Sequence, residues 1–305
     1  MKLRVMDVDQ TVASQFTRAR KQIVGTTFVT IGHVTKDITP TGTQIGGPGL
    51  YSAMTIAKLG HPVSLITRVG HDYSIGNVDS LIDLIDLESE VTTTFQNEET
   101  DSGRQQTIID VAPPISTSDI PWELLDSPVV LLAPVVGEIT PNFTAKFPKS
   151  LVGAGIQGWL RRWDSNGKVR ARSPKEAIGS LPPLGAVFVS EEDWFGSNSD
   201  MEEVAAASPI LVVTQSVAGA RMKLGDSWHE ITPTNVASVD PTGAGDVFAA
   251  SFLVRLYETR DPLESAQFAA CAAALSVEGI GVTSIPTREQ IVNKRDEFGS
   301  RGNPR

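Results

Sequence analysis

Two short apolar segments on either side of an amphipathic stretch constrain the fold of this chain most strongly. Thr27–His33 and Pro62–Val69 have the length and the β-branched content of buried strands. Between them, Leu50–Leu59 carries apolar residues at helical spacing, and Gly60 follows as a helix stop. A strand, a helix and a second strand in this order form a βαβ unit, whose two strands are parallel. The segment therefore predicts an α/β protein built on a parallel sheet.

The rest of the chain continues this alternation. Further buried-strand signals, with helical segments between some of them, lie at Pro128–Ala133, Leu151–Gln157, Ala186–Ser190 and Ile210–Thr214. Trp228–Thr232 has the pattern of a short edge strand. Ala244–Tyr257 and Pro262–Val277 are predicted helices, so the last third of the chain is mainly helical.

One segment departs from the alternation. Val91–Phe95 and Gln105–Val111 are β-prone and are separated by polar residues, a pattern that predicts a hairpin. Such a hairpin is either a flap over a binding site or an ordinary edge of a sheet, and the sequence leaves both open. We expect lid elements at about 34–45 and 91–111.

The length and the continuity of the 305-residue chain indicate one main domain. No internal repeat or long linker interrupts it. We expect this α/β domain to cover 22–300, preceded by an N-terminal extension at 1–21 and followed by a frayed tail at 301–305.

The charge balance excludes several classes of partner. The formal net charge is −10, and an acidic surface repels nucleic acids and anionic membranes. No apolar run approaches the roughly 20 residues that span a bilayer, and the first residues lack the apolar core of a secretory signal. The single cysteine, Cys271, excludes an internal disulfide. We therefore expect a cytoplasmic monomer or homodimer that acts on a small molecule.

The most informative motif is Asp240–Asp246, with the sequence DPTGAGD. It leads directly into a helix that is apolar nearly all round, which is typical of a buried helix. The N–H groups and the positive dipole end of a helix N-terminus bind anions. Gly243 and Gly245 let the backbone approach a phosphate closely. The motif therefore predicts a rigid phosphate site.

Asp246 is the one acidic residue placed at this predicted anion site. A carboxylate there can accept the proton of a hydroxyl group that attacks a phosphoryl group, as general-base catalysis requires. The alternative is a simple helix cap. The whole run, followed by an all-apolar helix, favours the catalytic interpretation.

The motif resembles the C-terminal signature of the ribokinase/PfkB carbohydrate kinases, usually D-T/P-x-G-A/C-G-D. The resemblance extends from about Thr27 to Gln290. It implies an α/β ribokinase-like three-layer sandwich with a mainly parallel central sheet, helices on both faces and a small β-hairpin lid. It also implies ATP-dependent phosphorylation of a hydroxyl group. Asp246 is then the catalytic base, and Gly243, Ala244 and Gly245 form the anion hole.

Two further segments resemble the substrate side of this family. Gly46 and Gly47, ahead of a helix of small residues, resemble its N-terminal di-glycine signature, whose backbone packs against the sugar. Gly32–Asp37 resembles its first-strand motif, which makes Asp37 a candidate contact for substrate hydroxyls. Taken alone, the two glycines are also compatible with a tight turn, and Asp37 with a solvated turn residue.

Two other segments resemble the donor side. Thr214–Gly219 occupies the place of the family's T-x-G-x-x-G nucleotide turn, which implies ATP contacts at Thr214, Ser216 and Gly219, although Ser216 replaces a glycine. Ser190 and Asp193 occupy the ends of the family's N-x-x-E motif. They imply an ATP contact at Ser190 and a water-mediated Mg²⁺ contact at Asp193. A charged helix start explains the second segment almost as well.

Asp240 and Ser284 lie where relatives with a monovalent-cation site supply ligands. The resemblance therefore implies a possible K⁺ site, for which a plain turn after a helix is the alternative.

The substrate is the least specified part. Where many relatives carry D-x-N, this chain has Gly155-Ile-Gln157, which makes Gln157 the candidate substrate contact. The segments that resemble the plant myo-inositol kinase branch are Ala133–Glu138, Ile156–Gly158 with Arg161, and Ser190-x-x-Asp193. We therefore expect a sugar or polyol kinase, with myo-inositol as the best guess. A nucleoside, ribose, fructose or fructose-phosphate kinase, or a non-catalytic sugar- or nucleotide-binding regulatory protein, are the alternatives.

Overall fold

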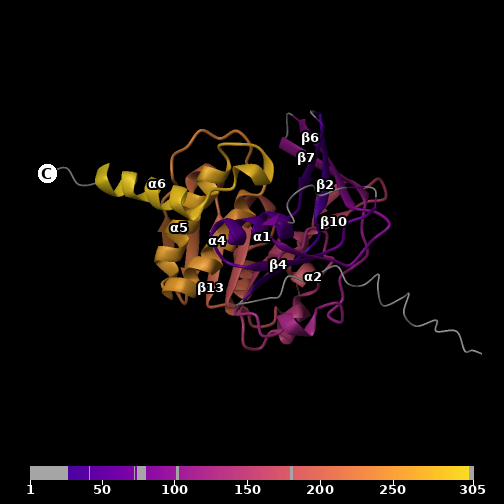
Figure 1. Ribbon diagram of the computed structural model, residues 1–305, viewed down its shortest axis with the longest axis horizontal. Helices are drawn as coiled ribbons and strands as arrows, with labels where there is room; N and C mark the ends of the chain where they lie inside the picture. Colours follow the sequence, from indigo (N-terminus) through magenta and orange to yellow (C-terminus); the bar gives the residue numbers. More distant parts are fainter. Residues whose placement is uncertain are drawn as a thin grey trace, which may run out of the picture.

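The computed structural model describes residues 27–40, 42–71, 73, 80–100, 103–178 and 181–301. The extension expected at 1–21, and the expected tail after Arg301, lie outside the described residues. Within this part of the chain the predicted fold class is confirmed: a large, mainly parallel sheet lies between two helical layers (Figure 1). No helix of the described residues is both long and apolar enough to cross a membrane.

The large sheet has nine strands in the order β15-β14-β13-β12-β9-β8-β1-β4-β5. Neighbours from β13 to β5 are parallel, and β14 and β15 add an antiparallel edge. The seven strands that the sequence predicts are confirmed, and β5 and β14 were not predicted. In chain order the bounds are β1 Phe28–Ile31, β4 Val63–Thr67, β5 Asp83–Asp86, β8 Val129–Leu132, β9 Leu151–Gly155, β12 Ala186–Ser190, β13 Ile210–Thr214, β14 Ala220–Leu224 and β15 Ser227–Ile231.

Each face of this sheet has its own apolar core, because successive side chains of a strand point to opposite faces. In β1, Phe28 belongs to one core, and Val29 and Ile31 belong to the other. The first core is covered by α1 Pro48–Lys58, α4 Ala244–Thr259, α5 Pro262–Ser276 and α6 Arg288–Arg301. The second is covered by α2 Pro174–Ile178, α3 Asn198–Ala206 and the 3₁₀ turns η2 Trp122–Leu124 and η3 Pro141–Lys146.

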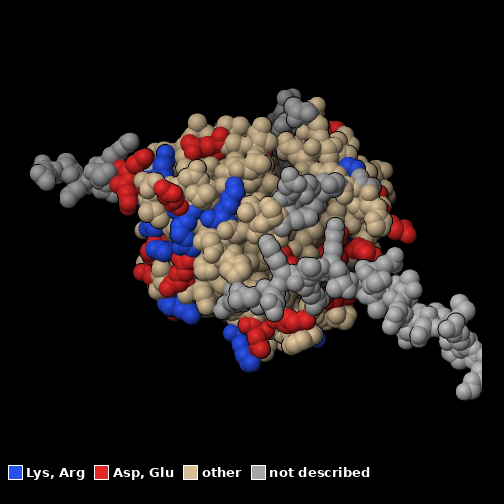
Figure 2. All heavy atoms as spheres, in the orientation of Figure 1, with Lys and Arg blue, Asp and Glu red and all other residues tan. Residues whose placement is uncertain are grey.

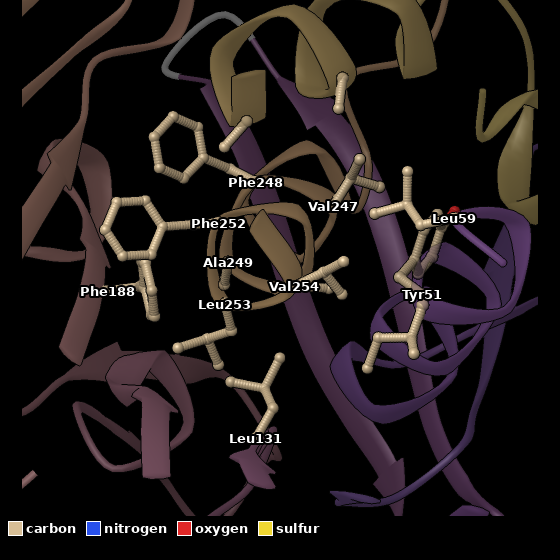
Figure 3. Packing of buried hydrophobic residues seen from close by; sticks show 14 of the residues in the cluster. Tyr51, Leu59, Leu131, Phe188, Val247, Phe248, Ala249, Phe252, Leu253 and Val254 are labelled. Carbon is tan, nitrogen blue, oxygen red and sulfur yellow. The ribbon is translucent and has the colours of Figure 1, made fainter. Parts of the chain in front are cut away.

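Helix α4 is buried along most of its length, as its all-apolar sequence predicts. Figure 3 shows Phe248 and Phe252 pointing toward Phe188 of β12, while Val247 points to the side where α1 lies. The rings of Phe188 and Phe252 meet edge to face at 5.4 Å between centroids. This packing fixes the N-terminus of α4 relative to the sheet.

A second, smaller sheet lies beside the large one, in the order β3-β2-β6-β7 (Figure 1). Its strands are β2 Thr35–Thr39, β3 Gly42–Gly46, β6 Thr93–Thr100 and β7 Gly103–Asp110. The hairpin predicted around 91–111 is confirmed as β6–β7. The expected lid was this hairpin alone. Because β2 pairs with β6 in parallel, the β2–β3 and β6–β7 hairpins together form one four-stranded sheet.

Another hairpin, which the sequence analysis did not predict, is formed by β10 Arg161–Trp163 and β11 Val169–Ala171. It is attached to the small sheet, because the Ile108 N–H of β7 donates to the Gly167 carbonyl at 2.8 Å. A side chain at Gly167 would overlap that strand.

Charged side chains join the helices of the first core at the surface. Figure 2 shows basic and acidic side chains intermingled over the region where α5 and α6 lie in Figure 1. Glu258 of α4 accepts from His61 at 2.7 Å, from Arg288 of α6 at 2.6 Å and from Arg255 at 3.3 Å. Burial alone would raise the pKa of Glu258, but the hydrogen bonds from Arg288 and His61 outweigh it and lower this pKa to about 2.

Glu258→Gln is expected to lower the free energy of unfolding by about 1 to 2 kcal/mol at neutral pH, because solvent partly screens its ion pairs. A lowered carboxyl pKa stabilises the fold above the unfolded value of 4.5, and this contribution disappears as the pH falls toward 2. The variant should therefore lose less stability than the wild type over that acid range. Urea unfolding at neutral and acid pH measures both effects.

Asp126→Asn is the matched control: its pair with Lys149 is about four-fifths exposed, so its loss should cost under about 1 kcal/mol. Equal losses in the two variants would contradict this prediction.

Candidate active site

The predicted anion site forms the N-terminus of α4. Gly243 is the N-cap residue with φ 78°, and a side chain there would overlap the ring of Tyr51 on α1. Glycine is therefore required at this position both for the backbone and for packing. Gly245 is different: it is exposed, and a methyl group there would meet nothing within 4 Å. The Ala244 N–H donates to the Pro241 carbonyl at 3.2 Å, and the Val247 N–H donates to the Gly243 carbonyl at 2.9 Å. The backbone N–H groups that could bind an anion are therefore those of Gly245 and Asp246.

Asp246 stands in a chain of polar side chains contributed by four elements. Gln157, in η4 Ile156–Gly158, donates from Nε2 to Asp246 Oδ1 at 3.4 Å. Arg161 of β10 donates to Gln157 Oε1 at 3.1 Å. The same guanidinium donates to Asp193 Oδ1 at 3.2 Å, in η5 Glu191–Asp193. The structure therefore brings together Asp246, Gln157 and Asp193, which the sequence analysis selected separately.

The environment of Asp246 favours its neutral form. Burial raises the pKa of Asp246 to about 7, while the Arg161 cation opposes this shift and the Asp193 carboxylate adds to it. A carboxyl group with a pKa near neutrality exchanges protons readily at neutral pH. Its position at an anion-binding helix end matches a group that accepts a proton beside a phosphate.

The substrate-side residues also meet. Asp37 lies on β2 against Gly46 of β3, where a side chain in place of glycine would overlap the Asp37 carboxylate. Thr35 donates from Oγ1 to Asp37 Oδ1 at 3.2 Å. Gly47, with φ 100°, is the N-cap of α1, and a side chain there would overlap the His33 carbonyl. Gly47 therefore permits close backbone packing that other residues do not, whereas a side chain at Gly46 would displace the Asp37 carboxylate.

Helix α1 connects the two halves of the candidate site. Gly47 begins this helix, and its carbonyl accepts from the Tyr51 N–H at 3.1 Å. The Tyr51 ring lies against Gly243 at the start of α4. One helical turn therefore separates the di-glycine segment from the anion-binding end of α4.

The predicted donor residues lie at the carboxyl ends of adjacent parallel strands. Ser190 ends β12 and pairs in register with Thr214, which ends β13. Ligands bind at this edge of open α/β sheets. Ser190 Oγ accepts from the Glu192 N–H at 3.2 Å and so caps η5.

In the turn after β13, Ser216 has a positive φ angle, which is more usual for glycine. Ser216, in η6 Ser216–Ala218, has φ 50°, a conformation that favours glycine. Gly219 has φ 92°, and a side chain there would overlap the Ile231 carbonyl. The Gln215 N–H donates to the Gly219 carbonyl at 2.8 Å and closes the turn. Serine therefore occupies a left-handed backbone position that glycine would adopt without strain.

Asp240 and Ser284 approach each other through η7 Gly281–Ser284. The Asp240 carboxylate accepts from Thr242 N–H at 3.0 Å and from Gly281 N–H at 3.3 Å. Ser284 Oγ donates to the Gly281 carbonyl at 2.7 Å. No group of three or more His, Cys, Asp or Glu side chains that could hold a metal ion occurs in the described ranges. The Mg²⁺ and K⁺ contacts remain predictions.

Two residues that the sequence analysis did not select as site residues support the site. Arg161 connects Gln157 and Asp193, although only its resemblance to one family branch marked it in the sequence. Glu138 is buried, and its carboxylate accepts from the N–H groups of His33, Val135 and Val136 at 2.8 to 3.1 Å. It thereby fixes the segments that follow β1 and β8. A single acidic residue in a loop gives no sequence signal of such burial.

Comparisons with known proteins agree with this geometry. A model of the pfkB family carbohydrate kinases matches residues 188–288. An inositol 3-kinase of Arabidopsis thaliana is 26% identical over 78% of this chain and 68% of its own length. A ribokinase of the same plant is 26% identical over 82% of this chain and 72% of its own length.

Among solved structures, a pyrophosphate-dependent kinase in the ribokinase family, complexed with a pyrophosphate analog and myo-inositol, superposes with a TM-score of 0.71. It is 22% identical, and the match covers 87% of this chain and 99% of that structure. The fold and the carboxylate at a glycine-rich helix end define a phosphotransferase with an alcohol group as acceptor. The chain is therefore similar to the ribokinase/pfkB carbohydrate kinases, through the family match at residues 188–288 and through kinase relatives along most of its length.

Proposed function

We propose that this carbohydrate kinase transfers the γ-phosphoryl group of ATP to a hydroxyl of a small polyol, with myo-inositol as the preferred acceptor. The observation that carries the proposal is the contact between Gln157 and Asp246, with Arg161 behind Gln157. Asp193 balances the charge of Arg161. The acceptor therefore contacts the side-chain amide of Gln157 next to the proposed base, Asp246. An uncharged amide suits an uncharged polyol better than a sugar phosphate. The relatives named for inositol support the same acceptor.

In the proposed reaction, Asp37 and the backbone at Gly46 and Gly47 hold the acceptor hydroxyls. Asp246 accepts the proton of the attacking hydroxyl, and Gln157 holds the Asp246 carboxylate in position. The open N–H groups at Gly245 and Asp246 stabilise charge on the transferred phosphoryl group. The small sheet acts as a lid that excludes water from this step.

On the donor side, the triphosphate lies along the strand ends at Ser190 and Thr214 and along the turn with Ser216 and Gly219. Asp193 would hold Mg²⁺ through a water molecule, and the ion would neutralise phosphate charge. Asp240 and η7, which a hydrogen bond from Gly281 connects, offer carboxylate and carbonyl oxygens, the ligand type that K⁺ takes.

A coupled assay of ADP release tests the acceptor. Myo-inositol, ribose, fructose, fructose 6-phosphate, adenosine and cytidine are compared at equal concentration. Pyrophosphate is tested as a second donor by the release of inorganic phosphate, because its reaction forms no ADP. We expect the highest kcat/KM with ATP and myo-inositol. A higher value with another acceptor would reassign the substrate within the family. Turnover with none of them, despite normal ATP binding, would support the non-catalytic alternative.

The pH dependence of kcat/KM tests the role of Asp246. A base must be deprotonated, so activity should rise with pH and level off above the Asp246 pKa of about 7. Because the Arg161 cation lowers this pKa, Arg161→Gln should move the rising limb to higher pH. Initial rates over roughly pH 5 to 9 measure both profiles. A rising limb at the same pH in both proteins would contradict the assignment.

A further inference from the structure

The small sheet carries a buried side-chain amide with an unused donor. Asn97 of β6 is only 7% exposed. Its Oδ1 accepts from Gln106 Nε2 of β7 at 2.9 Å, which fixes the orientation of the amide. Its Nδ2 is buried and has no hydrogen-bond partner among the described residues. A buried donor without a partner destabilises a fold, so this amide indicates a binding role.

Asn97 lies on the same face of the small sheet as Asp37, the proposed acceptor contact. β2 pairs with β6 in parallel, with Asp37 opposite Phe95, and residues paired in this way point to the same face. Side chains alternate between the two faces along a strand, so Asn97, two residues after Phe95, shares that face. The neighbours Gln96 and Glu98 lie on the opposite face and are half-buried and exposed, respectively.

The face that carries Asn97 packs toward the large sheet. Phe95 and Ile108 are buried on it against Val135, in the loop after β8. Each residue advances a strand by about 3.3 Å and paired strands lie about 4.8 Å apart, so the Cα atoms of Asp37 and Asn97 are about 8 Å apart. A six-membered ring with hydroxyl groups on opposite carbons bridges two side chains at that spacing.

The two side chains have complementary hydrogen-bonding roles. The Asp37 carboxylate only accepts hydrogen bonds, and Asn97 Nδ2 only donates them. A hydroxyl group does both, so one hydroxyl of a polyol ring donates to Asp37 while another accepts from Asn97. A ring that lacks the second hydroxyl leaves the Asn97 amide buried and unpaired, which is the condition for strong discrimination between similar substrates.

We propose that Asn97 is a specificity-determining residue, which donates from Nδ2 to a ring hydroxyl of the acceptor while Gln106 holds its amide in place. This inference rests on the proposed function, because it places the acceptor ring between Asp37 and Asn97. The acceptor class is an uncharged ring that carries free hydroxyl groups on opposite sides.

Deoxy analogues, combined with Asn97→Leu, test the contact. Leucine has a similar volume but no amide. kcat/KM is measured with myo-inositol and with each of its monodeoxy derivatives. In the wild type, loss of the contacted hydroxyl should lower kcat/KM at least about tenfold. In Asn97→Leu, myo-inositol itself should be about that much poorer, and the same deletion should cost less than about threefold. The KM for ATP should not change.

Two further variants separate the contact from a structural effect. Gln96→Leu is the matched control, because Gln96 is the adjacent amide on the opposite face of β6. It should retain the wild-type ratio of kcat/KM for every analogue. Asn97→Asp keeps an oxygen for Gln106 but has no donor, so it should behave like Asn97→Leu. A purely structural defect would lower kcat/KM for all analogues by one factor and preserve their ratios. Thermal unfolding checks that each variant is folded.

The outcomes distinguish this proposal from the proposed function. If another acceptor of the panel is preferred, the proposed acceptor is wrong, and the same comparison is made with the deoxy derivatives of that acceptor. If the wild type turns over no acceptor, the proposed function fails, and equilibrium binding of the same compounds replaces kcat/KM. Equal ratios of parent to deoxy compound in the wild type and in both Asn97 variants, at every ring position, would overturn the assignment of Asn97 alone.

Discussion

Asp246→Asn is expected to lower kcat by about 10³-fold, the middle of the range for loss of a general base. Asparagine keeps the shape of the side chain and its contact with Gln157, but it cannot accept the hydroxyl proton. The dissociation constant for ATP should change little, because the helix N–H groups of α4 remain. Single-turnover kinetics and calorimetric ATP binding measure the two quantities separately.

The stability of this variant is its control. Burial raises the pKa of Asp246, so the carboxylate is destabilised in the fold at neutral pH, and the neutral asparagine removes that cost. The variant should unfold at the same or a higher temperature than the wild type. Near-wild-type kcat in a stable variant would remove Asp246 from the mechanism.

Gly243→Ala and Gly245→Ala should separate stability from donor binding. Alanine at Gly243 meets an unfavourable φ of 78° and overlaps the Tyr51 ring, which together should cost about 3 kcal/mol of unfolding free energy. Alanine at Gly245 has open space around it, so stability should be retained or rise by up to about 1 kcal/mol. In the proposed reaction, however, this methyl group would meet the approaching phosphate.

We therefore expect Gly245→Ala to weaken ATP binding at least about tenfold, the cost of blocking a close contact to a charged group. Gly243→Ala should lose both stability and ATP binding. Urea unfolding and calorimetric titration with ATP measure the pair. Unchanged ATP affinity in Gly245→Ala would show that the phosphate does not approach this end of α4.

The sequence predicted best those features that a local pattern determines. The all-apolar run after Asp246 is sufficient to identify a buried helix, so α4 and the glycines at its N-terminus were predictable. Seven of the nine strands of the large sheet were predicted, most of them from β-branched runs that bury on both faces, whereas β5 and β14 were not predicted. Ser190 and Thr214 were selected by resemblance to family motifs, and the structure pairs them at the ends of two adjacent strands.

Features that depend on distant pairings were not predictable. β2 and β3 are short and partly exposed, and nothing local in Thr35–Thr39 indicates a parallel partner at β6. Arg161 reaches Asp193 only because β9 and β12 are neighbours in the sheet. The β10–β11 hairpin did leave a signal, since Asn166-Gly167 is a typical hairpin turn.

The parallel pairing of β2 with β6 has a consequence for how the molecule assembles. Each hairpin of the small sheet, β2–β3 and β6–β7, can form from neighbouring residues. The two hairpins are joined by the pairing of β2 with β6, which closes a chain loop that contains α1, β4 and β5. Closing so long a loop early would cost chain entropy without a core to compensate it. We therefore expect the large sheet to form first, and the small sheet to complete itself on that surface as a late folding event.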